Sequence, residues 1–263
     1  MKIGISTASL YPLHTEDAIL EVAKLGVSDT EIFLNSVSEL SGEVFAVIQG
    51  LVRDYRLNIM SLHPFTSPLE TLFLFSSYDR RFAELSDLYK RHFDMMNKIN
   101  AGIFVVHGAY KDSKCPDEMY AERFRDLVLI GKSMGITVAQ ENVCYCKSGK
   151  LEFLEMLSRE LGDDAHFVLD IKQVLRVEGE YSPTDYVKSL GKKIVHLHLS
   201  DSDETRDCLP IGDGNFDFAG LFRELREVGY SGGAVMELYR DNYAEYSRLA
   251  ESVEKLREIS KNA

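Results

Sequence analysis

Short apolar runs alternate with longer mixed segments along the whole chain of 263 residues. The apolar runs are rich in Val, Ile and Leu, as expected for strands of a parallel sheet that is buried on both faces. The segments between them read as helices, and this alternation predicts right-handed crossovers and a parallel sheet. The predicted strands are 2–8, 29–34, 58–63, 102–107, 136–142, 166–171, 194–200 and 232–238. The predicted helices are 15–25, 42–56, 79–100, 118–134, 150–161, 183–190, 220–229 and 243–260.

Eight strand–helix units in 263 residues leave about 33 residues for each unit, which favours a (β/α)₈ TIM barrel. An open doubly wound sheet fits less well, because no glycine-rich phosphate fingerprint follows the first strand. No linker-like stretch divides the chain, so residues 1–263 are expected to form one domain. The predicted fold class is therefore α/β, a single (β/α)₈ barrel with its active site at the carboxyl ends of the strands.

A charged or imidazole side chain closes six of the predicted strands. These residues are His63, His107, Glu141, Asp170, His198 and Glu237. Side chains alternate between the two faces of a strand, so one inward register brings all six to the barrel mouth. Taken singly, each such residue is more often a helix cap, an ion-pair partner or a hydrogen-bonded core residue. Converging carboxylates repel one another unless a cation or a shared proton neutralises them, and the set as a whole therefore predicts a metal site.

The four predicted ligands from the last four strands are Glu141, Asp170, His198 and Glu237. Mixed oxygen and nitrogen donors suit one divalent cation, either Mn²⁺, Mg²⁺, Co²⁺ or Zn²⁺. This set contains no thiolate, which argues against a structural zinc. The C-x-C sequence that ends at Cys146 is better explained as a pair of reduced loop thiols than as a further metal site.

Charge and hydropathy exclude several classes of partner. The formal net charge of −12 argues against nucleic-acid binding, because neutralisation of phosphates supplies much of that affinity. No apolar run approaches the roughly 20 residues needed to span a bilayer, so no membrane association is expected. The N-terminus enters a strand pattern directly and lacks the apolar segment of a signal peptide, so a cytoplasmic location is expected.

Seven motifs give the chain a specific resemblance. They are SLHP at 61–64, VVHGA at 105–109, QENV at 140–143, LDIKQ at 169–173, VHLHLSD at 195–201, PIGDGNFDF at 210–218 and VMELY at 235–239. In these motifs and their order the chain resembles the xylose isomerase-like TIM-barrel family, also called the sugar phosphate isomerase/epimerase or AP-endonuclease-2-like superfamily. The motifs cover nearly the whole chain and are specific for the superfamily rather than for one substrate.

The resemblance implies a divalent-metal-dependent isomerase or epimerase of a small sugar or sugar derivative. In that branch of the family, one metal would be held by Glu141, Asp170, His198 and Glu237. Glu141 and Glu237 would also be the catalytic acid/base pair, one removing a proton next to a carbonyl and the other returning it to an enediolate intermediate. Related isomerase or dehydratase chemistry could use the same residues.

The resemblance also implies four substrate-binding residues, with a small carbohydrate as the partner. His63 and His107 are interpreted as groups that contact the substrate or the metal ligands. Gln173 stands where many sugar epimerases have a substrate-contacting His, and an amide can bond a hydroxyl but cannot carry a proton. Arg206 lies in the loop where relatives often place an Arg on substrate oxygens, and a solvated surface role is an equal alternative.

Two other functions are left open by the sequence. An endonuclease IV-like phosphoester hydrolase would use His63 and His107 as zinc ligands, but Gln173 and the RDC sequence at 206–208 depart from its ligand pattern. The other alternative is a non-catalytic carbohydrate-binding barrel, in which Gln173 marks lost chemistry.

Four further features carry weaker expectations. His196 is interpreted as a core histidine, and Glu31 as a residue that orients His63, contacts a ligand or forms a structural ion pair. The glycines of the PIGDGNFDF segment are expected to form a turn into a helix rather than a phosphate cradle. The apolar loop 64–78 is expected to line the substrate site or a subunit contact, which would make the protein a homodimer or homotetramer.

Overall fold

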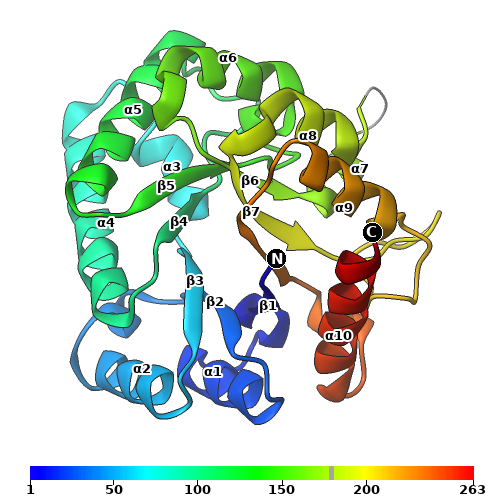
Figure 1. Cartoon of the computed structure of the whole chain (residues 1–263). Coiled ribbons are helices and arrows are strands. Elements are labelled where there is room, and N and C mark those ends of the chain that lie inside the picture. The colour runs from blue at the N-terminus through cyan, green and yellow to red at the C-terminus, as the bar shows by residue number, and fades with distance from the viewer. Residues whose placement is uncertain (178–180) are drawn as a thin grey trace.

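Eight parallel strands close into a barrel in which each strand pairs with its neighbours in sequence and β8 pairs with β1 (Figure 1). The computed structural model describes residues 1–177 and 181–263. The strands are β1 (Ile3–Ser6), β2 (Asp29–Phe33), β3 (Asn58–His63), β4 (Ile103–Val106), β5 (Thr137–Glu141), β6 (Phe167–Asp170), β7 (Ile194–Leu199) and β8 (Gly233–Met236). The predicted (β/α)₈ barrel is confirmed.

Helices surround the barrel and connect successive strands (Figure 1). They are α1 (Thr15–Lys24), α2 (Gly42–Asp54), α3 (Ser67–Phe73), α4 (Asp79–Ile99), α5 (Asp117–Ser133), α6 (Leu151–Leu161), α7 (Ile171–Arg176), α8 (Pro183–Leu190), α9 (Phe218–Glu227) and α10 (Ser247–Asn262). No helix in residues 1–177 or 181–263 is long and apolar enough to cross a membrane. The eight predicted helices are present with small shifts at their ends.

Two short helices were not predicted from the sequence. Helix α3 occupies part of the segment expected to be an apolar loop, and Pro68 near its start suits a first helical turn. Its Glu70 is fully buried and accepts hydrogen bonds from the Tyr89 hydroxyl and the Gly108 amide. Helix α7 begins directly after β6, because the Asp170 side chain caps it. Both helices lie at the carboxyl ends of their strands and therefore shape the barrel mouth.

The core has two parts that follow from the alternation of side chains along each strand. Val105, Ala139 and Val168 form a small buried cluster of their own inside the barrel. Each stands two residues before a predicted site residue, which confirms the inward register for His107, Glu141 and Asp170. The intervening residues point outward into the larger core beneath the helices, where Phe104 packs against rings of α4.

A buried histidine of α4 predicts how stability depends on pH. His92 is fully buried, and its Nδ1 donates a hydrogen bond to the Leu88 carbonyl oxygen at 2.9 Å. Burial lowers the pKa of His92 from 6.5 to about 4. Below pH 6.5 the unfolded chain therefore binds a proton that the folded chain does not bind, and stability is lost as the pH falls from about 6.5 to about 4.

We therefore expect His92→Leu to remove roughly 3 kcal/mol of the stability loss between pH 7 and pH 4. Urea unfolding of both proteins across this pH range measures the difference. His14→Leu at an exposed position is the control, and it should leave the pH profile unchanged. Parallel profiles for the wild type and His92→Leu would contradict the assignment.

Candidate active site

Three side chains from neighbouring strands meet at the barrel mouth. His63 at the end of β3, His107 just after β4 and Glu141 at the end of β5 form one group that could hold a metal ion. His63 Nε2 lies 2.8 Å from His107 Nε2, and Glu141 Oε2 lies 2.8 Å from His107 Nε2 and 3.5 Å from His63 Nε2. Two ring nitrogens that approach so closely cannot both carry a proton, so the group resembles a ligand set.

A second group shares Glu141 and adds Asp170 and His198, and one donor atom from each residue lies within 4.8 Å of the others. All three side chains are almost fully buried. Among the described residues, neither Glu141 Oε2 nor Asp170 Oδ2 has a hydrogen-bond partner. Each oxygen has a nitrogen close by, His107 Nε2 at 2.8 Å from Glu141 Oε2 and Lys172 Nζ at 3.2 Å from Asp170 Oδ2, but neither contact is a hydrogen bond of normal geometry. A divalent cation between the two oxygens would satisfy both. These residues therefore fit a divalent metal ion.

Glu31 on β2 holds His198 from behind. Its Oε2 lies 3.0 Å from His198 Nε2 and accepts a hydrogen bond from the Ser61 hydroxyl at 2.7 Å. The other ring nitrogen, His198 Nδ1, faces Glu141 Oε1 at 3.1 Å. A carboxylate behind a histidine is the usual support of a metal ligand, since it sets the ring orientation and the tautomer. Of the roles expected for Glu31, the structure shows the ion pair, and the ring that it orients is His198 rather than His63.

His196 lies one layer deeper in the barrel, as expected. It is fully buried, and its Nε2 lies 3.0 Å from the Ser61 hydroxyl and 3.5 Å from Glu31 Oε2. Its Nδ1 has no hydrogen-bond partner in the part of the chain that the structure describes. His196 is therefore a core histidine, as predicted, but only one of its two ring nitrogens has a hydrogen-bond partner among the described residues.

Lys172 is a site residue that sequence analysis missed. Its ammonium lies 3.2 Å from Asp170 Oδ2 and 3.2 Å from Glu237 Oε1, so it bridges two predicted metal ligands. Glu237, which follows β8, is the most exposed of the four predicted ligands and lies 3.7 Å from His198 Nδ1 through its Oε2. The signal in the sequence is the Lys two residues after Asp170, within the LDIKQ motif.

Neighbouring charges decide the ionisation of this cluster. Burial by itself would raise the pKa of Glu141, but His107, His198 and His63 hold it well below its ordinary value. Burial would likewise lower the pKa of Lys172, and the carboxylates of Asp170 and Glu237 instead raise it well above the usual range. Glu141 is therefore a carboxylate and Lys172 an ammonium at neutral pH.

The two remaining predicted substrate-binding residues lie at the mouth in different surroundings. Gln173 is buried on α7, and its Oε1 accepts a hydrogen bond from the Cys144 amide at 3.1 Å. Arg206 is exposed and forms an ion pair with Asp203. It lines a cavity of about 600 Å³ together with Arg176 and Tyr239. Because the Lys172 ammonium lies 5.3 Å from the centre of the Tyr239 ring, this cavity adjoins the cluster at the mouth.

The PIGDGNFDF segment after β7 wraps around a carboxylate of the chain itself. Asp201 accepts hydrogen bonds from the amides of Gly212, Gly214 and Phe216 at 2.8 to 3.1 Å. Gly212 has a φ of +90°, and a Cβ at Gly214 would lie 2.3 Å from the Ser202 carbonyl oxygen. These amides are therefore occupied by Asp201, and the segment is a turn that leads into α9, as expected.

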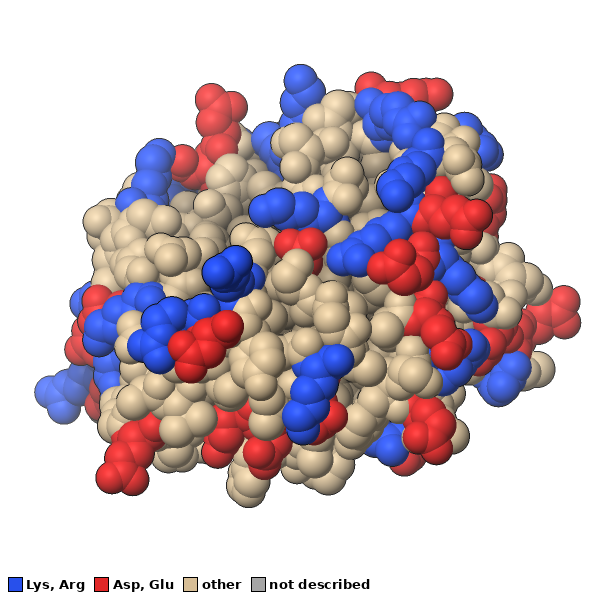
Figure 2. Space-filling model, turned by 60° about the horizontal axis from the view of Figure 1, so that its bottom comes forward, with Lys and Arg blue, Asp and Glu red and all other residues tan. Residues whose placement is uncertain are grey.

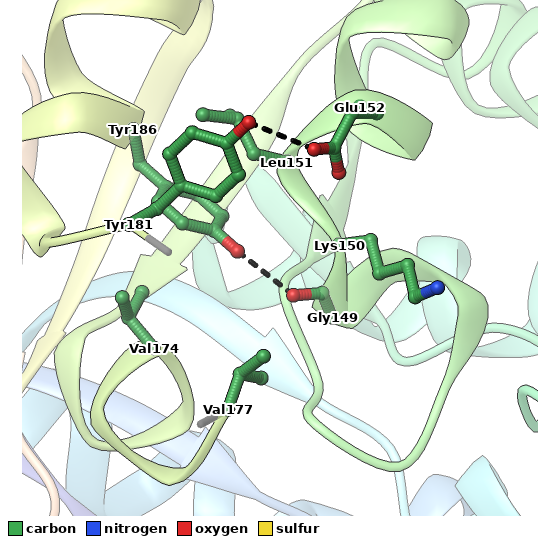
Figure 3. A pocket seen from close by; sticks show the side chains of 8 residues that line it. All are labelled: Gly149, Lys150, Leu151, Glu152, Val174, Val177, Tyr181 and Tyr186. Atoms are coloured by element: carbon green, nitrogen blue, oxygen red, sulfur yellow. Dashed lines mark hydrogen bonds between the residues drawn. The ribbon is translucent and has the colours of Figure 1, made fainter. Parts of the chain in front are cut away.

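A separate cavity of about 340 Å³ lies between the start of α6 and helices α7 and α8 (Figure 3). In Figure 3 the Tyr181 hydroxyl donates to Glu152 and the Tyr186 hydroxyl donates to the Gly149 carbonyl oxygen. Its lining is Gly149, Lys150, Leu151, Glu152, Val174, Val177, Tyr181 and Tyr186. This lining shares no side chain with the histidine and carboxylate groups, so we place the candidate active site at the barrel mouth.

Comparison with known proteins agrees with this geometry. The family model described as xylose isomerase-like TIM barrel matches residues 19–259 of the chain. The chain belongs to this family. Among its relatives, fructoselysine 3-epimerase from Shigella flexneri is 25% identical over 253 residues, which cover 90% of this chain and 90% of that enzyme. The predicted resemblance is thereby confirmed.

Solved structures share the fold over the full chain. D-Psicose 3-epimerase from Clostridium cellulolyticum H10, solved with D-tagatose, has a TM-score of 0.79 at 16% identity and covers 100% of this chain and 99% of its own. The IolI protein, solved with a zinc atom bound, also has a TM-score of 0.79 at 16% identity, with 100% and 99% covered. At this identity the likeness establishes a common fold.

Proposed function

We propose that this protein is a divalent-metal-dependent isomerase or epimerase of a small sugar or sugar derivative. The observation that carries the proposal is the convergence of Glu141, Asp170 and His198 at the mouth of a family barrel, where two buried carboxylate oxygens make no hydrogen bond to the described residues. The fructoselysine 3-epimerase relative supports a carbohydrate substrate and epimerase chemistry. The IolI protein, with its zinc atom, supports metal binding in this fold.

The proposed mechanism uses two carboxylates that face the same space. One cation would be held by Glu141, Asp170 and His198, with Glu237 beside them, and when bound it would polarise the carbonyl and hydroxyl oxygens of the substrate. One of Glu141 and Glu237 takes the proton from the carbon next to the carbonyl, which leaves an enediolate. The other carboxyl returns a proton, either to the opposite face of that carbon or to the neighbouring carbon, and in the second case the hydroxyl proton also passes to the former carbonyl oxygen.

The surrounding side chains would position the sugar. His63 and His107 contact Glu141 directly through their Nε2 atoms, so the two rings would orient its carboxylate and line the substrate beside it. Gln173 has its Oε1 engaged with Cys144, which leaves its amide N–H groups for a hydroxyl. Arg206 and the cavity next to Tyr239 would bind the end of the substrate farther from the carboxylates.

One observation favours a second candidate, a phosphoester hydrolase that uses more than one metal ion. The ring nitrogens of His63 and His107 converge with Glu141 Oε2 as in a separate ligand set. Against it stand Gln173 and the RDC sequence at 206–208, which supply no further histidine. On the face shown in Figure 2, Lys and Arg are interspersed with Asp and Glu, and the net charge of −12 disfavours a DNA substrate.

The test combines metal analysis with proton exchange. Purified protein is loaded with Mn²⁺ or Zn²⁺, desalted and assayed for metal, and then incubated with a panel of ketoses in D₂O. About one equivalent of metal and incorporation of deuterium next to the carbonyl of at least one sugar are expected. Two or three zinc ions per chain, together with cleavage of abasic DNA, would show a phosphoester hydrolase instead of an isomerase. Sugar binding without any exchange would make the protein a non-catalytic carbohydrate-binding barrel.

A further inference from the structure

Helix α7 turns back over the site immediately after β6, and this turn decides where Lys172 points. Asp170 Oδ1 accepts hydrogen bonds from the amides of Lys172 at 2.8 Å and Gln173 at 3.3 Å. One oxygen of Asp170 is therefore committed to capping the helix, while Oδ2 lies 3.2 Å from the Lys172 ammonium. The cap fixes the backbone amide of Lys172 at Asp170 Oδ1, and the Lys172 side chain folds back so that its ammonium reaches Oδ2 of the same residue.

The ammonium of Lys172 lies between two carboxylates, where a bound cation would also lie. It is 3.2 Å from Asp170 Oδ2 and 3.2 Å from Glu237 Oε1, and its side chain is only 4% exposed. The Tyr239 ring covers the ammonium, with 5.3 Å between Nζ and the ring centre. Lysines are rarely buried to this extent without paired charges, so this one is held by the two carboxylates and the ring.

We propose that Lys172 is a built-in cation of the site that competes with the divalent metal for Asp170 and holds Glu237 as its own partner. The inference rests on the proposed function and adds a division of labour to it. The metal is held by Glu141, Asp170 and His198, while Glu237 stays paired with Lys172 and is positioned for proton transfer. Lys172 is thus a positioning residue for Glu237, and it weakens metal binding compared with a site that lacks it.

The charges of the described residues support this division. The site contains three carboxylates, those of Glu141, Asp170 and Glu237. The Lys172 ammonium neutralises one of these negative charges, and a single divalent ion would neutralise the other two. Glu31 lies outside this group, because it contacts His198 and His196 rather than the ammonium. A second divalent ion would leave an excess of buried positive charge, so Lys172 favours a mononuclear site.

The experiment measures Mn²⁺ affinity by electron paramagnetic resonance of the free ion. Lys172→Met removes the competing charge, so it is expected to bind Mn²⁺ about tenfold more tightly than the wild type, or better. Its turnover is expected to fall despite the tighter metal, because Glu237 loses its partner. Lys172→Arg keeps a positive charge and should stay near the wild-type affinity. If Lys172 only supported the structure, its replacement by Met would not raise Mn²⁺ affinity and lower turnover at the same time.

Lys193→Met is the matched control, since it removes the same charge far from the barrel mouth. Lys193 directly precedes the amino end of β7 and donates hydrogen bonds to Ser158. It should leave Mn²⁺ affinity unchanged, and circular dichroism checks that all variants are folded. Unchanged or weaker Mn²⁺ binding by Lys172→Met overturns the inference, as does the absence of Mn²⁺ binding in both proteins. Deuterium exchange by the wild type is measured in parallel, so a failure of the isomerase proposal is recognised separately.

Discussion

Glu237→Gln is expected to lower turnover of the protein's sugar substrate by about a thousandfold, because the amide can neither remove nor return a proton. Metal affinity should change little, since Glu141, Asp170 and His198 come together without Glu237 in the structure. The amide still accepts a hydrogen bond from Lys172, so the shape of the site is preserved. Deuterium incorporation from D₂O into the substrate measures the chemical step, and Mn²⁺ titration measures the metal.

Glu204→Gln is the control for this experiment, because it removes an exposed carboxylate from the loop after β7. Its turnover should match the wild type. Glu141→Gln should also lose turnover, but with weaker metal binding, since Glu141 belongs to both groups of converging donors. Turnover by Glu237→Gln at the wild-type rate would remove the acid/base role from this residue.

Asp170→Asn is expected to weaken Mn²⁺ binding by about a hundredfold or more, because a direct ligand loses its charge. The Asn side chain can still cap α7 through its oxygen, so the fold should survive. Its amide nitrogen would then stand where Asp170 Oδ2 had formed an ion pair with the Lys172 ammonium at 3.2 Å. Elemental analysis after desalting and Mn²⁺ titration both report the loss, and turnover should fall with the metal.

Asp203→Asn tests whether any carboxylate at the mouth has this effect. Asp203 is ion-paired with Arg206 in the same region, but it belongs to none of the converging donor groups. Its metal content should equal that of the wild type. Equal metal content in Asp170→Asn would mean that the cation is bound elsewhere, and the site would have to be reassigned.

The six strand-end residues could be predicted because the spacing of side chains on a strand is local. Val105 and His107, or Ala139 and Glu141, share a face in any strand of this direction, and barrel closure then aligns them. The structure confirms this register through the buried cluster of Val105, Ala139 and Val168. Which residues bind metal or substrate is still a prediction that the experiments above address.

Contacts between elements were harder to foresee. An ion pair was one of the roles expected for Glu31, but its partner His198 was not foreseen. Strand β2 pairs with β3 through a register shift between Thr30 and Glu31, which sets Glu31 beside Ser61. A bulge of this kind depends on how two strands pair and leaves no mark in either sequence segment. The Glu31 carboxylate of β2 then lies 3.0 Å from His198 Nε2 of β7, across the barrel interior.

The sequence alone determined the order of strands and helices, the closed barrel and the set of polar side chains at its mouth. Those features depend on apolar periodicity and on the alternation of side chains, which are properties of neighbouring residues. Only the tertiary structure decided the partners: Glu31 behind His198, His107 beside Glu141, and Lys172 between Asp170 and Glu237. The last arrangement joins residues 65 positions apart, and it exists because a helix capped by Asp170 turns a long lysine side chain into the barrel mouth.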